Sequence, residues 1–116
     1  MTEELLRRTK TLGINVIYLV DKLPNKPSGW AIGKQIVRSA TSVGANYRAS
    51  RLAKSKADFI YKLKIVEEEC DETIFWLEMI EEAKILNRED VYAIKKEAAE
   101  LFAIFVASLK TIKAKI

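Results

Sequence analysis

The sequence predicts an all-α protein, built as an up-and-down antiparallel bundle of four helices. Three observations predict this fold: apolar residues recur at alternating spacings of three and four, turn-forming and capping residues interrupt this repeat at three places, and no strand-like alternation remains. Long helices joined by short loops are mostly antiparallel neighbours. With 116 residues, the chain is expected to form a single domain, residues 1–116.

The first helix is expected from about Glu3 to Leu23. Pro24 and Pro27 follow it. Proline cannot donate to the helical hydrogen-bond ladder, and it disfavours the helical conformation in the residue before it. The core face predicted for this helix consists of Leu5, Thr9, Leu12, Val16, Leu19 and Leu23.

The second helix is expected from Ser28, as its N-cap, to about Ala53. It is rich in alanine, serine and glycine. Serine and glycine lower helix propensity, so we expect these small residues to let a neighbouring backbone come close. The predicted core face consists of Ile32, Ile36, Ala40, Val43 and Tyr47.

The third helix, from about Lys56 to Leu86, is the longest. Its start is predicted by Ser55 followed by Asp58, which has the spacing of a capping box. The predicted core face consists of Phe59, Leu63, Val66, Cys70, Thr73, Leu77 and Ile80.

Three large apolar residues of the third helix, Phe75, Trp76 and Met79, lie off its core face. A helix of roughly 30 residues is about 45 Å long, and a narrow rod of that length has much surface for its volume. Apolar area left exposed would be an aggregation liability. We therefore expect self-association, with these three residues in the oligomer interface.

The fourth helix is expected after Asn87, because Asn87 followed by Asp90 has the pattern of a helix start. An apolar repeat then continues almost to the end of the chain. The predicted core face consists of Val91, Ile94, Ala98, Leu101, Phe105, Ser108 and Ile112.

Composition argues against most enzyme and metal chemistry. The chain has no histidine, one cysteine and no glycine-rich phosphate loop, so it lacks the usual nucleophile, general-base and zinc constellations. We expect no enzyme activity, no cofactor and no metal, and a buried Cys70. No apolar run approaches the roughly 18 residues of a membrane span, and the first residues lack a signal peptide's apolar segment. The expected location is cytoplasmic, without a membrane partner.

Charge is segregated along the chain, although the net charge is only +4. Residues 34–66 carry eight basic and one acidic side chains, whereas residues 67–90 carry two and ten. Three interpretations are open: the basic block binds nucleic acid, it complements the acidic block of a neighbouring subunit, or both blocks are simply solvated. Tyr61 is the one candidate for base stacking. The candidate nucleic-acid-binding residues are Lys34, Arg38, Arg48, Arg51, Lys54, Lys56 and Lys62.

Three stretches resemble a known family: QIVRSATSVGANYR at 35–48, AKSKADFIYKL at 53–63 and ECDETIFWLE at 69–78. They are similar to the four-helix-bundle proteins encoded by intervening sequences within bacterial 23S ribosomal RNA genes. The resemblance implies an up-and-down bundle, assembly as a homopentameric ring and no established enzyme activity. Distant relatives, the accessory variability proteins of diversity-generating retroelements, engage nucleic acid and a reverse transcriptase.

The polar residues within these stretches have a structural interpretation and a ligand-binding one. Asn46 is expected near the edge of the core, where an unsatisfied amide would cost about 1 to 3 kcal/mol. Glu69 or Glu72 could accept a hydrogen bond from Asn46 or from Arg38, which would form a polar cross-link that fixes helix register. A ligand site, or a divalent metal on Glu69 and Glu72, is the alternative.

These observations together predict a non-catalytic oligomeric scaffold that binds RNA or single-stranded nucleic acid through the basic block. The expected partners are further copies of the chain, as a pentamer, and the nucleic acid. The alternative is an accessory module that binds a reverse transcriptase or a ribosome-associated protein and does not contact nucleic acid directly.

Overall fold

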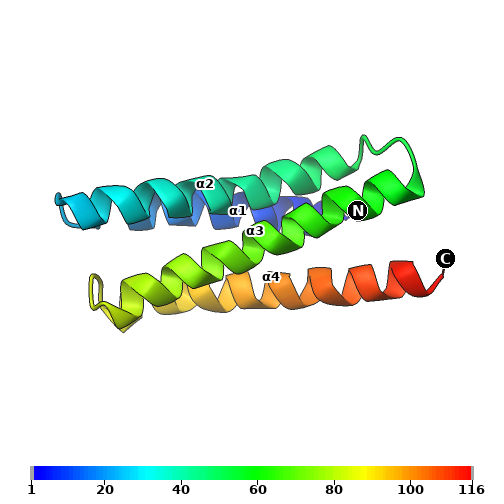
Figure 1. Cartoon of the computed structure of the whole chain (residues 1–116). Coiled ribbons are helices and arrows are strands. Elements are labelled where there is room, and N and C mark those ends of the chain that lie inside the picture. Colours follow the sequence, from blue (N-terminus) through cyan, green and yellow to red (C-terminus); the bar gives the residue numbers. More distant parts are fainter. Residues whose placement is uncertain (1, 116) are drawn as a thin grey trace.

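The computed structural model describes residues 2–115 and has four helices in that range. They are α1 (Glu3–Val20), α2 (Pro27–Ser50), α3 (Lys56–Glu82) and α4 (Arg88–Ala114). Consecutive helices run antiparallel and form a rod of 47 × 21 × 20 Å (Figure 1). The predicted up-and-down bundle is confirmed. The start of α1 and the end of α4 lie in the half of the rod where α2 and α3 are joined (Figure 1).

All four helices contribute to one apolar core. Every residue of the four predicted core faces is buried or half-buried, so the periodicity identified the inward side of each helix correctly. Tyr47 and Phe105 pack ring against ring within this core, with centroids 5.4 Å apart. The fully buried apolar residues are Leu12, Val16, Leu19, Ile36, Ala40, Val43, Tyr47, Leu63, Val66, Cys70, Leu77, Ile80, Val91, Ala98, Leu101, Phe105 and Leu109.

The backbones of α1 and α2 approach each other closely, as the small residues of α2 predicted. A Cβ atom added to Gly44 would lie 3.2 Å from the main-chain carbon and oxygen of Thr9. One added to Gly13 would lie 3.4 Å from the Cα of Thr41. Because glycine has no side chain, the two backbones can lie this close, and a surface groove lined by Gly13 and Gly44 lies between the helices.

The ends of α1 and α2 differ from the prediction. α1 stops at Val20 instead of Leu23, because the next residues form tight turns in which the Leu23 amide donates to the Val20 carbonyl. α2 starts at Pro27 with Lys26 as its N-cap, so Ser28 is not the cap. Proline suits the first helical position because an N–H group there would have no acceptor within the helix, so its absence costs no hydrogen bond.

The N-cap of α3 is confirmed, and its reciprocal bond differs in detail. The Ser55 hydroxyl accepts from the Asp58 amide at 3.0 Å. The Asp58 carboxylate accepts from the amide of Lys54 instead of that of Ser55. The helix ends at Glu82, before the predicted Leu86, because Lys84 adopts a left-handed conformation with φ of 56°.

The start of α4 follows Asn87 as predicted, although the Asn87 side chain makes no capping hydrogen bond. The Asn87 carbonyl instead accepts from the amide of Asp90 at 3.1 Å. No helix within residues 2–115 combines the length and apolar character needed to cross a membrane.

Candidate nucleic-acid interface

Arg38, a candidate nucleic-acid contact, is engaged by two carboxylates of α3. Its guanidinium donates to Glu69 at 3.2 Å and also to Glu72. Glu72 accepts a second bond from the Trp76 indole at 3.1 Å. The hydrogen bond from Arg38, followed by the one from Trp76, holds the pKa of Glu72 below its ordinary value. This group therefore links α2 to α3, as the structural interpretation expected.

Asn46 is not part of that group. Its side-chain amide donates to the Ser42 carbonyl of its own helix at 2.8 Å. Of the two donors considered for Glu69 and Glu72, Arg38 and not Asn46 makes the bond, so placing Asn46 in the polar network is wrong. A carbonyl one turn back in its own helix accepts from the Asn46 amide instead. Within residues 2–115, no cluster of three carboxylate or cysteine side chains is arranged to hold a metal ion.

Lys62 is also paired within the chain. Its ammonium group lies 2.9 Å from both carboxylate oxygens of Asp58. The Lys54 amide, followed by Lys62, lowers the pKa of Asp58. The Lys62 charge thus stabilises the first turn of α3, whereas the Lys54 side chain itself is exposed.

The antiparallel arrangement gathers the basic residues in one half of the rod. The half that holds the α2–α3 turn comprises residues 2–11, 39–69 and 101–115, and it carries 12 of the 20 basic but only 6 of the 16 acidic side chains. We call the exposed cations near its tip the basic end. They are Arg51, Lys54, Lys56, Lys110, Lys113 and Lys115.

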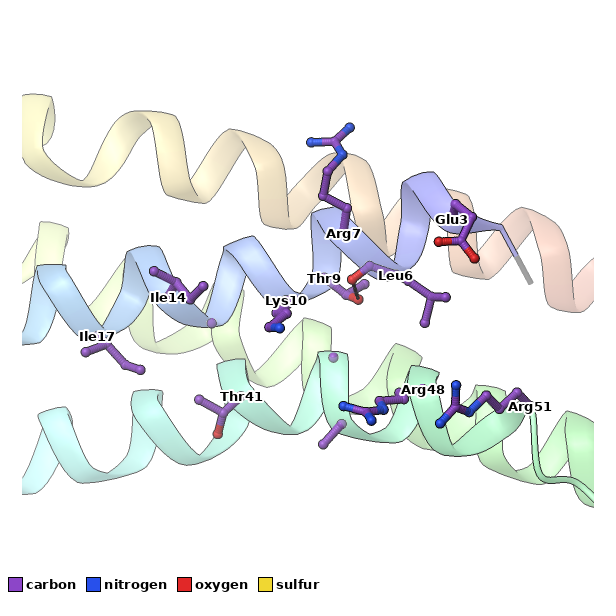
Figure 2. Close-up of a pocket in the computed structure, with 13 residues that line it drawn as sticks. Glu3, Leu6, Arg7, Thr9, Lys10, Ile14, Ile17, Thr41, Arg48 and Arg51 are labelled. Atoms are coloured by element: carbon purple, nitrogen blue, oxygen red, sulfur yellow. Dashed lines mark hydrogen bonds between the residues drawn. The ribbon is translucent and has the colours of Figure 1, made fainter.

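Three of these six cations come from α4 and the residue after it, and sequence reasoning did not name them. The predicted topology was sufficient to find them, because an up-and-down bundle brings the end of the fourth helix next to the connection between the second and third helices. Arg7 and Lys10 of α1 were also not named, although the same antiparallel arrangement brings the start of α1 to this half of the rod. They line one surface groove together with Arg48 and Arg51 (Figure 2).

The remaining candidate residues lie elsewhere. Lys34 is exposed in the other half of α2, away from the basic end. Phe75 and Met79 are 48% and 41% exposed on α3. Trp76 is half-buried against the core and contacts the Phe75 ring edge-on. Tyr61, the candidate stacking residue, is 66% exposed.

Cys70 is buried, as expected, and its surroundings disfavour the reactive thiolate form. Its thiol donates to the Ala98 carbonyl at 3.2 Å. Burial is the main cause that raises its pKa to about 12. The reactive thiolate is therefore almost absent at neutral pH.

Comparison with known proteins agrees with the resemblance in the sequence. A family model described as 23S rRNA-intervening sequence protein matches residues 3–107. A solved structure of a protein of unknown function from the S23 ribosomal protein family of Bacteroides thetaiotaomicron VPI-5482 has a TM-score of 0.85 and 32% sequence identity. The match covers 91% of this chain and 98% of that one. No curated protein matches the chain.

Proposed function

Because the chain belongs to the 23S rRNA-intervening sequence protein family, we propose that it is a non-catalytic, oligomeric scaffold of the cytoplasm that binds RNA or single-stranded nucleic acid at its basic end. The oligomer is a homopentameric ring, as the family resemblance implies. This function requires binding only and no catalytic acid, base or nucleophile.

The observation that carries the proposal is the convergence of cations from separate parts of the chain. The basic end combines the α2–α3 turn with the last turns of α4, so its six exposed cations lie at the same end of the rod. None of the six forms an ion pair within residues 2–115. Unpaired, exposed cations at one end of a rod attract a polyanion and release its counterions on contact.

The character of this surface favours a single strand over a specific duplex site. Tyr61 is exposed on α3, in the same half of the rod, and can stack on an unpaired base. The basic end consists of five lysines and one arginine at the ends of helices and in a turn, and such side chains contact phosphates. It does not offer the side of a recognition helix, which is what proteins insert into a major groove to read bases. We therefore expect affinity with little sequence preference.

The test measures binding of a fluorescein-labelled, mixed-sequence RNA of about 20 nucleotides by anisotropy at low salt. We expect the double variant Lys54→Gln with Lys56→Gln to bind about tenfold more weakly. Both side chains are exposed and unpaired within residues 2–115, so the fold should not change.

The matched control is Lys26→Gln with Lys34→Gln, which removes two exposed, unpaired cations from the other half of the rod. It has the same net charge as the test variant, and we expect nearly native affinity. Equal losses in both variants would show a general charge effect and contradict a site at the basic end. If the native protein fails to bind RNA at low salt, the proposal is wrong and the accessory role with a protein partner gains support.

A further inference from the structure

A surface groove with a volume of about 560 Å³ lies between α1 and α2. Its floor is formed where Gly13 and Gly44 allow the two backbones to meet. Ile14 and Ile17 line it and are 40% and 43% exposed. Figure 2 shows both isoleucines on α1, on the side of the groove farther from the basic end. A nucleic-acid backbone binds through its phosphates and does not need the apolar surface that Ile14 and Ile17 provide.

The charged residues of the groove are nearly all basic. Arg7 and Lys10 on α1 and Arg48 and Arg51 on α2 line it, with Glu3 as the one acidic member. None of these five side chains has an ion-pair partner within residues 2–115, although the adjacent Arg8 pairs with Glu97 at 2.6 Å. In Figure 2, Arg7 points away from α2, so the basic surface extends over the outer side of α1.

The outer side of α3 carries the opposite pattern. Between residues 64 and 79 its exposed residues are Lys64, Glu68, Asp71, Phe75 and Met79, at spacings of four, three, four and four. This spacing aligns them along one line of the helix. None of the three charged members is in an ion pair within residues 2–115. We call this line the α3 stripe.

The two surfaces match position by position. The outer line of α1 along the groove consists of Glu3, Arg7, Lys10, Ile14 and Ile17, at spacings of four, three, four and three. Read in the same direction, the α1 line is acidic, basic, basic, apolar, apolar, and the α3 stripe is basic, acidic, acidic, apolar, apolar. Each line spans about 21 to 23 Å at 1.5 Å per residue.

We propose that the groove is the docking site for the α3 stripe of a second copy of this chain. In this contact the partner's helix lies parallel to α1, so that acidic side chains meet Arg7 and Lys10 while Phe75 and Met79 cover Ile14 and Ile17. The contact rests on the oligomeric part of the proposed function, and it explains the apolar area that the single bundle leaves exposed on both helices.

The parallel direction has a consequence for the assembly. Within one bundle α1 and α3 point the same way, so neighbouring copies also point the same way (Figure 1). The contact joins two different surfaces, and such a head-to-tail contact produces a ring when its rotation closes. All basic ends then lie on one side of the assembly, where several copies can bind one nucleic acid strand.

The test is a charge exchange followed by sedimentation at about 10 µM. The groove variant carries Arg7→Glu and Lys10→Glu, and the stripe variant carries Glu68→Lys and Asp71→Lys. We expect each to dissociate to the 13.2 kDa monomer, with association weakened at least about a hundredfold by the opposed like charges. The chain with all four substitutions should assemble again, because each groove then meets a stripe of opposite charge.

The control variant Lys26→Glu with Lys34→Glu reverses two exposed charges outside both surfaces and should stay assembled. Circular dichroism of every variant should show native helix content, since the exchanged side chains are exposed. If both exchange variants remain assembled, or if the fourfold variant stays monomeric, the docking proposal is wrong while an oligomer through another surface stands.

A native protein that is itself monomeric overturns both the docking and the oligomeric scaffold. If the groove variant keeps its mass but loses RNA affinity, the groove is a nucleic-acid surface and the docking proposal fails. RNA binding at the basic end is measured separately by Lys54→Gln with Lys56→Gln, which should weaken binding without changing the mass. The two proposals can therefore fail independently.

Discussion

Arg38 offers the sharpest distinction between a structural cation and a nucleic-acid contact. In the sequence it belongs to the basic block, yet in the structure it joins Glu69 and Glu72 of α3. We predict that Arg38→Gln lowers the stability of the bundle and changes RNA affinity by less than about twofold. Its charge is already neutralised by two carboxylates, so it has little attraction left for phosphate.

The expected loss of stability follows from the exposure of the three side chains. Arg38 is 48% exposed, and the Glu69 and Glu72 side chains are 20% and 33% exposed. Ion pairs with this much solvent contact contribute about 0.2 to 1 kcal/mol each. Glu72 keeps its bond from Trp76 after the substitution. The Glu69 carboxylate loses its bonds from Arg38, but its side chain is partly exposed and can be hydrated instead. We expect a total loss of about 1 kcal/mol, or roughly 4 °C in Tm.

The loss should also depend on pH. Arg38 lowers the pKa of Glu72 in the folded state, so the folded protein binds this proton less readily than the unfolded chain does. The resulting stabilisation is complete above the unfolded pKa of about 4.3 and is lost as the pH falls through the lower folded value. The difference in stability between the native protein and Arg38→Gln should be constant above about pH 5.5 and shrink towards pH 3.

The assay is urea unfolding followed by circular dichroism at pH 7 and pH 3.5, with both proteins at one concentration. RNA anisotropy is measured in parallel at pH 7. If Arg38→Gln loses as much RNA affinity as Lys54→Gln with Lys56→Gln, with unchanged stability, the assignment of Arg38 to a helix-linking role is refuted.

Three further predictions concern packing and capping. Cys70 should not react with a thiol-specific disulfide reagent in the folded protein at pH 8 and should react fully in urea, because it is buried with a pKa of about 12; fast labelling of the native protein would contradict this. Ser55→Ala should cost about 1 kcal/mol of unfolding free energy through loss of the cap, and an unchanged urea midpoint would disprove it. Gly44→Val should cost about 1 to 3 kcal/mol, because its Cβ would press on the main chain of Thr9, and a native-like melting temperature would show that α1 can move away.

The fold was predictable because apolar periodicity marks the inward side of a helix directly. The helix ends were less predictable, since side chains beyond an end can still pack on the core. Leu23 and Leu86 both lie outside helices yet are half-buried against it. Their apolar character extended the predicted helices, whereas tight turns and the left-handed Lys84 ended the observed ones.

The candidate site was less predictable, because the state of a charge depends on its neighbours in space. Arg38 and Arg48 look alike in the sequence, yet Arg38 faces α3 and its acids, whereas Arg48 faces the groove. Only the packing of α2 between α1 and α3 separates them. Lys113 lies far along the chain from the basic block and joins it because α4 is antiparallel to α3.

The salt dependence of RNA binding tests the central claim most directly. If about four phosphates are neutralised at the basic end, the logarithm of the association constant should fall with the logarithm of salt concentration with a slope of about −3. Anisotropy of the labelled single strand with the native protein, measured between about 50 and 300 mM salt, gives this slope. A slope of that size is the result that a nucleic-acid-binding basic end predicts, and a slope near zero, or no binding at 50 mM salt, would contradict it.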